Sequence, residues 1–443
     1  MRERIREEAL NLKRCVHGGN STDDIIDFSA SINPLAPPDA TDIVLAAYKR
    51  IGHYPDDRYT AFREAAANFV GVSANNIIPG NGSTEIIRLF AETVIERGDW
   101  VTIPCPTFGE YEFQSRLFGA RPRFIEYEKV KNGQISDSVL KGSKALCICN
   151  PNNPTGDLLP RDVLTDLATR CSKNKIFLFV DEAFIELSDP EQSIADVAAE
   201  NDFVFVLRSL TKCFAVPGIR IGYGIGSVRL VELLDRARLQ WNLNIFADVI
   251  GVHLLKNPEY LERSRELIKT EREWLINRLS SIIGIRPLQS KANFILLDIS
   301  GTDLTSREIT QRMLEHGIQV RDCSSFRSLG ETHVRVAVKT RAENEGLATA
   351  FNHALEHDHL GCEYYPCHFE GQDCTFCFCP FYSCEDERPG KFTKKSSGGV
   401  AWSCINCNII HQPDVAQEVL DRLLAGDELS KVWKIIERRL CTG

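Results

Sequence analysis

A lysine follows an apolar run near the middle of the chain, with hydroxyl and guanidinium groups close to it in sequence. This lysine, Lys212, comes after Ser209 and Thr211, and Arg220 follows eight residues later. Burying the charged ammonium of a lysine costs free energy unless the charge is paired or the amine takes part in a reaction. An aldehyde cofactor provides such a reaction, because the amine forms a Schiff base with it. The two hydroxyls and Arg220 would then hold the phosphate of that cofactor.

A carboxylate completes this pattern. Asp181 ends an earlier apolar run and would face a protonated ring nitrogen. Such a contact makes a pyridine ring an electron sink, while the lysine holds the aldehyde and later moves protons at Cα. The residues together predict a pyridoxal 5'-phosphate site in which Lys212 and Asp181 are the catalytic residues.

Three more segments supply parts of the same site. Gly82, Ser83 and Thr84 follow an apolar segment and open a predicted helix, whose free N–H groups suit a phosphate. Simple N-capping by one of the two hydroxyls is the alternative, and both can hold. Phe108 is a candidate to stack on the pyridine ring, although a lone aromatic more often lies in a core. Asn153, presented by a Pro-Thr-Gly turn, would hydrogen-bond the ring hydroxyl.

Short apolar runs alternate with amphipathic segments from about residue 60 to 226. Apolar residues at consecutive positions are typical of strands buried on both faces of a parallel sheet. The alternation predicts α/β architecture, with ligands at the carboxyl ends of the strands. The predicted strands are Val101–Ile103, Ala145–Cys149, Ile176–Val180, Phe203–Leu207 and Ile219–Gly224.

Pattern and composition divide the chain into four parts. Residues 1–40 are predicted to be an N-terminal arm that contributes to the substrate site, and 41–250 a large cofactor-binding domain. Residues 251–356, which begin with a long helix over about 259–279, are predicted to form a smaller α+β domain. Residues 360–443 are a cysteine-rich domain that ends in one helix over about 415–440.

Charge and hydropathy exclude several classes of partner. The net charge of -9 leaves no basic face for nucleic acid. The charged N-terminus lacks the apolar region of a signal peptide, and no apolar run approaches the ~18 residues of a membrane span. We therefore expect a cytoplasmic protein without nucleic-acid or membrane partners.

The ordered motifs resemble fold-type I pyridoxal-phosphate enzymes, in the branch that holds histidinol-phosphate aminotransferase and threonine-phosphate decarboxylase. The resemblance covers about residues 15–355. It implies a large domain with a mainly parallel sheet and a smaller α+β domain, to which the cysteine-rich domain is appended. It also implies the roles given above for Asn153, Asp181, Lys212 and Arg220.

The same resemblance implies further contacts. Tyr54 would reach the cofactor phosphate of a neighbouring subunit, so that two chains form a homodimer with shared active sites. Arg335 matches the arginine that grips the substrate carboxylate, and Arg321 would be a second basic contact. One position departs from the family: Phe184 stands where many of its aminotransferases have tyrosine. The missing hydroxyl leaves the ring oxygen to Asn153 and counts against ordinary transamination.

The N-terminal arm distinguishes between reactions. His17 precedes Gly18 and Gly19, which let backbone N–H groups approach an anion closely, and the imidazole adds a donor. A flexible turn is the alternative. The segment is similar to the threonine-phosphate decarboxylase pattern, in which it helps to bind the substrate phosphate. The segment around Asn33 resembles the same family, so His17, Gly18, Gly19, Asn33, Asn153, Arg321 and Arg335 are the expected substrate-binding residues.

The resemblance therefore implies decarboxylation of a phosphorylated amino acid, L-threonine O-3-phosphate, to (R)-1-amino-2-propanol O-2-phosphate, the linker precursor of cobalamin. Two alternatives stay open. One is a histidinol-phosphate-type aminotransferase. The other is a metal-binding regulator on a degenerate transferase fold, against which the complete set of cofactor residues counts.

The tail differs from the rest of the chain in composition, since nine of the 16 cysteines fall from Cys362 onward. Two Cys-x-x-Cys pairs and a nearby histidine predict metal binding, as two zinc sites or an iron–sulfur cluster. The tail resembles a known small cysteine-rich domain whose metal binding is itself inferred. It would be a structural module or carry a second function, such as partner docking, redox control or supply of phosphorylated threonine, although no kinase signature is present. The predicted ligands are Cys362, Cys367, Cys374, Cys377, Cys379, Cys384, Cys404, Cys407 and His411.

Overall fold

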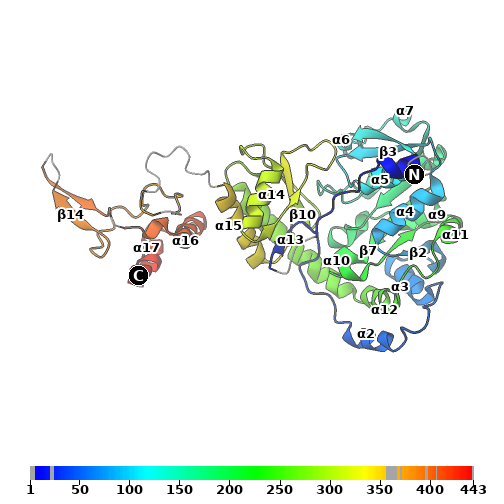
Figure 1. Cartoon of the computed structure of the whole chain (residues 1–443), viewed down its shortest axis with the longest axis horizontal. Coiled ribbons are helices and arrows are strands. Elements are labelled where there is room, and N and C mark those ends of the chain that lie inside the picture. Colours follow the sequence, from blue (N-terminus) through cyan, green and yellow to red (C-terminus); the bar gives the residue numbers. More distant parts are fainter. Residues whose placement is uncertain are drawn as a thin grey trace. The chain divides into compact units, whose positions relative to one another are not determined.

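The computed structural model describes residues 5–19, 24–355, 367–369, 372–394, 398–405 and 407–441. The chain forms two compact units, Met1–Leu355 and Glu356–Gly443, which Figure 1 colours from blue to yellow and from orange to red. In the described part of the chain, no helix is long and apolar enough to cross a membrane.

A seven-stranded sheet of order β2-β8-β7-β6-β5-β3-β4 forms the centre of the first unit. Neighbouring strands are parallel except at β8, which runs antiparallel to both β2 and β7. The sheet is therefore mixed and mainly parallel, as the apolar runs predicted. Its strands are β2 (Ile77–Gly80), β3 (Trp100–Cys105), β4 (Arg121–Glu126), β5 (Ser143–Cys149), β6 (Phe177–Asp181), β7 (Val204–Ser209) and β8 (Gly222–Ile225).

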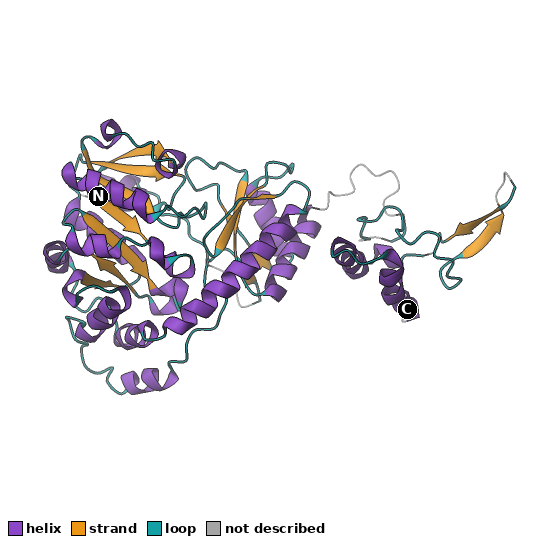
Figure 2. Cartoon of the chain, turned by 180° about the vertical axis from the view of Figure 1, so that it is seen from behind, coloured by secondary structure: helices purple, strands orange, loops and turns teal. Residues whose placement is uncertain are grey.

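Alternate side chains of the central strands enter two different cores. On β6, Leu178 and Val180 belong to one hydrophobic cluster, and Phe179 belongs to the cluster on the other face. Helices supply the rest of both clusters and cover the sheet (Figure 2). The principal ones are α3 (Thr60–Val70), α4 (Ser83–Val94), α5 (Glu110–Leu117), α8 (Arg161–Lys173), α11 (Val228–Ala237) and α12 (Ile245–Leu255).

One predicted strand begins later than expected. The prediction placed it at Ile219–Gly224, whereas β8 starts at Gly222. Pro217–Ile219 forms a 3-10 turn, and Arg220 takes a left-handed backbone with φ 58°. Proline has no N–H for a ladder and a left-handed residue breaks the pleat, so the strand can start only after this turn.

The long predicted helix is confirmed as α13 (Pro258–Ser280), which leads into the smaller domain (Figure 2). That domain is built on an antiparallel sheet of order β12-β13-β10-β9. Arg321 on β12 lies directly opposite Arg335 on β13 in the strand register. The elements are β9 (Arg286–Pro287), β10 (Phe294–Asp298), β12 (Arg321–Asp322), β13 (His333–Ala337), α14 (Ser306–Glu315) and α15 (Arg341–Leu355).

The N-terminal arm is part of the smaller domain. Its strand β1 (Ile26–Asp27) pairs in parallel with β11 (Ile318–Gln319). Phe28, fully buried, packs into the hydrophobic core of that domain. The arm is therefore fixed to the scaffold at the residues that follow the His-Gly-Gly segment.

The second unit contains a hairpin of β14 (Lys391–Lys394) and β15 (Val400–Ser403), followed by α16 (Pro413–Leu424) and α17 (Leu429–Ile436). The single closing helix predicted over about 415–440 is wrong. The chain turns at Gly426, whose φ of 86° no helix interior adopts. The turn lets both helices pack on one small core that includes Phe381 and Ile409.

Candidate active site

A cavity of about 330 Å³ opens at the carboxyl ends of β5, β6 and β7. The arm, the large domain and the smaller domain all contribute to its wall. Most of the residues predicted from the sequence meet there, although they are separated by as many as 300 positions. Those that line it are His17, Gly18, Ser83, Thr84, Phe108, Asn153, Asp181, Thr211, Lys212, Arg220, Arg321 and Arg335.

Lys212 lies on α10 (Leu210–Cys213), the short helix that follows β7 directly. Burial lowers the pKa of its ammonium to about 8, and the positive charges of Arg335 and Arg220 act in the same direction. A lowered pKa increases the share of neutral amine near neutral pH, and the neutral amine is the nucleophile. The lysine is thus suited to bind an aldehyde.

Asp181, at the end of β6, is buried beneath the cavity. The Tyr111 hydroxyl donates to its Oδ2 at 2.7 Å and the backbone N–H of Ala183 donates to Oδ1 at 2.9 Å. Burial raises the pKa of the carboxyl to about 6, and these two hydrogen bonds oppose the rise. A protonated ring nitrogen facing the carboxylate would favour its ionised form.

Tyr111 is a site residue that the sequence analysis missed. It lies on α5, three residues after Phe108, and its ring is fully buried between Phe108 and Phe179. Phe108 precedes the helix, so no helical spacing links the two residues, and only the packing of α5 on the sheet aims the hydroxyl at Asp181.

A phosphate cradle lies at the start of α4, as the sequence predicted. Gly82 precedes the helix with φ 78°, and a Cβ added there would lie 2.4 Å from a guanidinium nitrogen of Arg220. Ser209 and Thr211 share a hydrogen bond of 2.8 Å between their hydroxyls. Free N–H groups at a helix start, two hydroxyls and one guanidinium form a donor set that fits a phosphate.

Arg335 provides a second anion-binding group. Its guanidinium donates to Asn153 Oδ1 and, at 2.8 Å, to the carbonyl of Ser29, while its buried Nε lacks a partner among the described residues. Burial lowers its pKa to about 10, so it stays charged at neutral pH. Because Arg335 occupies the oxygen of Asn153, the amide NH₂ of Asn153 is left to donate to a ring hydroxyl.

Some predicted residues lie outside the cavity wall. Gly19 is held by its N–H, which donates to Ser29 Oγ at 3.0 Å. Tyr54 is 77% exposed and stacks on Trp241 at 4.4 Å between ring centroids. Its predicted contact with a neighbouring subunit is not tested by a single chain.

Asn33 requires a correction, because its side chain holds the arm and does not line the cavity. Its Nδ2 donates to the carbonyl of Cys213 at 2.7 Å and to Ser264 Oγ at 2.8 Å. Its backbone N–H donates to the carbonyl of Lys212 at 3.1 Å. Asn33 therefore fastens the arm behind the lysine, a role that its position in the sequence does not reveal.

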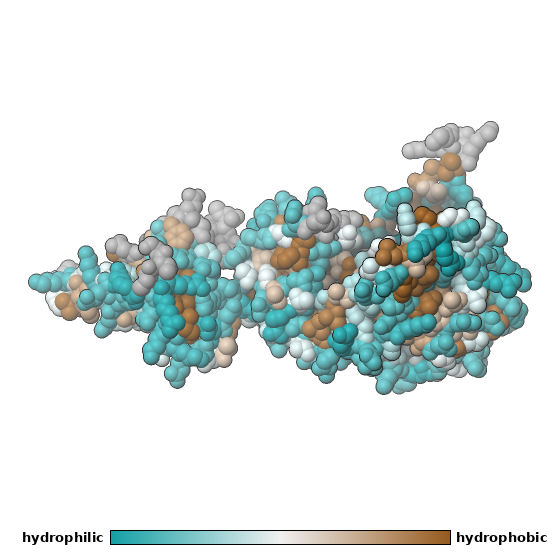
Figure 3. Space-filling view, turned by 90° about the horizontal axis from the view of Figure 1, so that it is seen from below, coloured by the Kyte–Doolittle hydropathy of each residue, from teal (hydrophilic) through white to brown (hydrophobic). Residues whose placement is uncertain are grey.

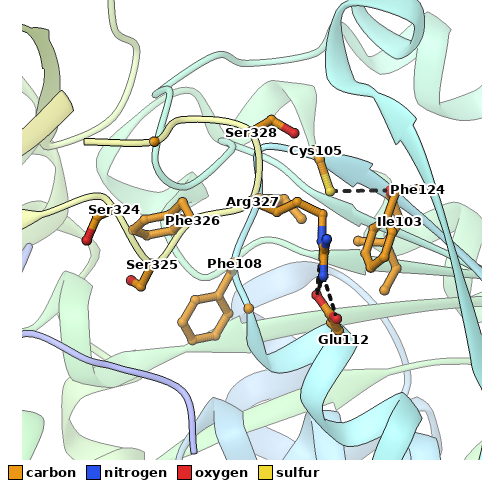
Figure 4. A pocket seen from close by; sticks show the side chains of 13 residues that line it. Ile103, Cys105, Phe108, Glu112, Phe124, Ser324, Ser325, Phe326, Arg327 and Ser328 are labelled. Atoms are coloured by element: carbon orange, nitrogen blue, oxygen red, sulfur yellow. Dashed lines mark hydrogen bonds and ion pairs between the residues drawn. The ribbon is translucent and has the colours of Figure 1, made fainter. Parts of the chain in front are cut away.

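A second cavity, of about 400 Å³, borders the first and shares Phe108 and Phe326 with it. Figure 4 shows Arg327 at its wall, paired with Glu112 of α5. The shorter of the two ion-pair distances is 2.8 Å, and the guanidinium also lies 3.9 Å from the ring centroid of Phe124. This contact ties the 324–330 loop of the smaller domain to the large domain.

Some of the predicted metal ligands of the second unit lie near one another: burial raises the pKa of the Cys379 thiol to about 11, and the nearby Cys407, Cys384 and Cys404 act in the same direction. Among the residues that the structure describes, no group of three or more Cys, His, Asp or Glu side chains is close enough to hold a metal ion. Cys362 lies outside the described residues, and every described cysteine from Cys367 to Cys407 is free of disulfides. Cys367 Sγ lies 3.1 Å from Nδ1 of His368, and the ring centroids of His368 and His411 are 4.2 Å apart. The donor types suit zinc or an iron–sulfur cluster, so metal binding stays a prediction.

Comparison with known proteins defines the class. Residues 23–351 match the family described as aminotransferase class I and II, and residues 353–433 match a cysteine-rich small domain. The chain belongs to the class I and II aminotransferase family. The solved histidinol-phosphate aminotransferase of Sinorhizobium meliloti in complex with pyridoxal 5'-phosphate has the same fold, with a TM-score of 0.72, 20% identity and coverage of 80% of this chain and 97% of that one. The predicted fold class is confirmed.

Relatives with two different activities resemble the chain. A protein of Caldanaerobacter subterraneus named "Putative threonine-phosphate decarboxylase" is 37% identical over 361 residues, which cover 79% of this chain and 96% of the relative. A histidinol-phosphate aminotransferase of Methanosarcina mazei is 33% identical over 365 residues, with the same two shares. The family is thereby shown, and the reaction has to be argued from the site.

Proposed function

We propose that this chain is a pyridoxal-phosphate-dependent carboxy-lyase that converts L-threonine O-3-phosphate to (R)-1-amino-2-propanol O-2-phosphate, for cobalamin synthesis. The observation that carries the proposal is the lining of one cavity by His17 and Gly18 of the arm together with Arg321 and Arg335. A substrate with both a carboxylate and a phosphate requires two sets of donors. The cavity offers them in addition to the cradle for the cofactor.

The cofactor, when bound, supplies an electron sink for the electron pair left at Cα. The chain's own residues then do four things. Asp181 holds the proton on the ring nitrogen, and Asn153 donates to the ring hydroxyl. Lys212 would hold the aldehyde of the cofactor. Its ammonium would also be placed to return a proton to Cα of the substrate.

Orientation of the substrate decides which bond breaks. The bond at Cα that lies perpendicular to the cofactor ring is the one that overlaps with its π-system. A decarboxylase must hold the carboxylate there, whereas an aminotransferase must hold the Cα hydrogen there. Arg335, Arg321 and a phosphate grip near His17 would fix the substrate at both ends and thereby set this rotation.

The runner-up is a histidinol-phosphate-type aminotransferase, favoured by the Methanosarcina mazei relative. Phe184 counts against the aminotransferase. Its ring packs against Phe294 at 5.0 Å between centroids and provides no hydroxyl to the cavity.

Turnover without an acceptor distinguishes the two reactions. We expect the purified holoprotein to release carbon dioxide and aminopropanol phosphate from L-threonine O-3-phosphate with no keto acid present. Glutamate formed from histidinol phosphate and 2-oxoglutarate, without carbon dioxide from threonine phosphate, would overturn the proposal in favour of the aminotransferase.

The active unit is proposed to be a homodimer. Several exposed apolar side chains lie close to Tyr54 in the sequence, namely Leu45 and Tyr48 of α2 (Thr41–Tyr48) and Ile51, and the partly exposed Trp241 stacks on its ring. Figure 3 looks at the side of the first unit that carries α2 and shows apolar surface there. An apolar patch of this kind marks an interface, and it would bring Tyr54 to the cofactor phosphate of the second copy.

Mixed dimers test this arrangement. Lys212→Ala and Tyr54→Ala subunits are each expected to be impaired. If Tyr54 acts across the interface, coexpression restores one intact site per mixed dimer and recovers part of the activity. No recovery in a mixed dimer isolated with two different affinity tags would contradict it.

The cysteine-rich unit is proposed to bind zinc or an iron–sulfur cluster, because its core is small and its sequence is rich in cysteines of the kind that bind these metals. Elemental analysis and the visible spectrum of the full chain, purified without oxygen, would identify the metal. Full-length protein without zinc or iron would refute the proposal.

A further inference from the structure

A buried carboxylate holds the histidine of the arm. Glu110, in the first turn of α5, is 4% exposed, and its Oε1 lies 3.0 Å from Nε2 of His17. Its other oxygen, Oε2, accepts a hydrogen bond of 2.9 Å from Gln114 one turn further along the helix. Both oxygens of Glu110 therefore have fixed partners, and one of them is the imidazole at the cavity wall.

The carboxylate is built to stay charged. Burial alone would raise the pKa of Glu110, but the hydrogen bonds from His17 and Gln114 outweigh it, and the pKa is lowered. The neighbouring thiol of Cys15 has its pKa raised to about 12, mainly by burial and then by Glu110, so it remains neutral. The negative charge beside the imidazole thus belongs to Glu110 alone among these three groups.

The backbone of the arm is held independently of Glu110. Arg321 donates to the carbonyl of Val16 at 2.7 Å, and Gly19 N–H donates to Ser29 Oγ. Gly18 lies so close to Ser29 that an added Cβ would stand 2.5 Å from its carbonyl oxygen. The backbone on both sides of His17 is thereby fixed, so the orientation of the ring depends on its side-chain contacts, the hydrogen bond to Glu110 and the ring of Phe108, 5.8 Å away between centroids.

We propose that Glu110 is a positioning residue for phosphate recognition: it fixes the ring of His17 through Nε2 and leaves Nδ1 to donate to the phosphate of the substrate. The inference rests on the proposed function insofar as the substrate is phosphorylated. An ionised Glu110 keeps the Nε2–H tautomer and stabilises an imidazolium when an anion arrives on the other side. The positively charged imidazole of His17 then lies between two negative groups, the carboxylate of Glu110 and the phosphate. The guanidinium of Arg321 is a second cation near the phosphate.

Glu110 was not predicted from the sequence. The residue lies 93 positions from His17, and an acidic residue in the first turn of a helix is ordinarily explained by the helix dipole. Only the return of the arm over α5 makes it a partner of the histidine.

The test compares two neighbouring carboxylates of α5 in the full-length holoprotein. Glu110→Gln removes the charge next to His17 and keeps the shape, whereas Glu112→Gln removes a charge that pairs with Arg116 and Arg327 (Figure 4). Calorimetry measures the Kd of inorganic phosphate, and kinetics measures KM and kcat for L-threonine O-3-phosphate. Each variant is also combined with His17→Ala.

We expect Glu110→Gln to raise the Kd of phosphate and the KM by about tenfold, the scale of one charge-assisted hydrogen bond, with kcat little changed. Glu112→Gln should leave the Kd within about twofold. In the His17→Ala background, Glu110→Gln should add nothing, because the group that it positions is gone.

An unchanged phosphate Kd in Glu110→Gln would overturn the inference, and so would an equal loss in Glu112→Gln. Phosphate binding needs no turnover, so the two proposals can fail separately. Weak phosphate binding in Glu110→Gln together with no decarboxylation would refute the proposed reaction and leave the role of Glu110 intact.

Discussion

The first unit brings its chemical groups together around one cavity, whereas the described cysteines of the second unit are not close enough to hold a metal ion. In the first unit, strand ends and helix starts place Asp181, Lys212 and Ser83 around one space. In the second unit, the described cysteines lie on loops beside a small core and form no metal-sized group. A large core can hold costly polar groups in place without a ligand, whereas a small cysteine-rich domain depends on its ligand to order it.

The strongest test of the first region is Lys212→Ala. We expect carbon dioxide release to fall by more than about 10³-fold, because this amine both holds the cofactor and moves the proton. Lys173→Ala, at the exposed end of α8, is the matched control and should keep its rate. A residual rate near that of the control would show that the cavity is not the active site.

Removal of metal tests the second region. We expect a strong chelator to unfold the second unit, so that a protease cuts the chain after about residue 355 and releases an intact first unit. Mass spectrometry of the fragments measures the site of cleavage, and decarboxylation by the remaining unit serves as the control. If the second unit resists the protease equally with and without chelator, it does not need a metal to fold, and the proposed difference between the two regions is contradicted.

The anchor of the arm should contribute to stability. Asn33→Ala removes two buried hydrogen bonds, to Cys213 and Ser264. We expect the free energy of unfolding of the first unit to fall by about 1 to 3 kcal/mol, measured by urea denaturation. Asn75→Ala, an exposed asparagine, should change it little. Unchanged stability would mean that the other contacts of the arm, such as its strand pairing and the buried Phe28, hold it without Asn33.

The smallest expected effect concerns Tyr111→Phe. Burial raises the pKa of Asp181 to about 6 even though the hydrogen bond from Tyr111 lowers it, so loss of that hydroxyl should raise the pKa further. Asp181 must be ionised to hold the ring nitrogen, so cofactor affinity should begin to fall at a higher pH as the solution is acidified. Titration of pyridoxal 5'-phosphate followed by visible absorbance measures the shift, and identical pH profiles would contradict it.

Local chemistry made much of this molecule predictable. Consecutive apolar positions located four of the seven strands of the large sheet closely, and polar residues at their ends located Asp181 and Lys212. The strands β2 and β4 were not identified from the sequence, because β2 has four residues with a proline and β4 is only partly buried and carries charges. Prediction also failed at Gly426, where a change of backbone direction ended a helix that hydrophobic periodicity would have continued.

The sequence by itself indicated the residues of the cofactor site. A lysine, a carboxylate and donors for a phosphate are needed at the end of a strand or the start of a helix, and the ends of strands and starts of helices can be recognised from short stretches of sequence. The tertiary structure alone decided the partners of these groups. Tyr111 reaches Asp181 across 70 positions, Glu110 reaches His17 across 93, and Arg335 reaches Asn153 across 182. These contacts depend on how helices pack and how the arm returns, and no local propensity encodes such long-range geometry.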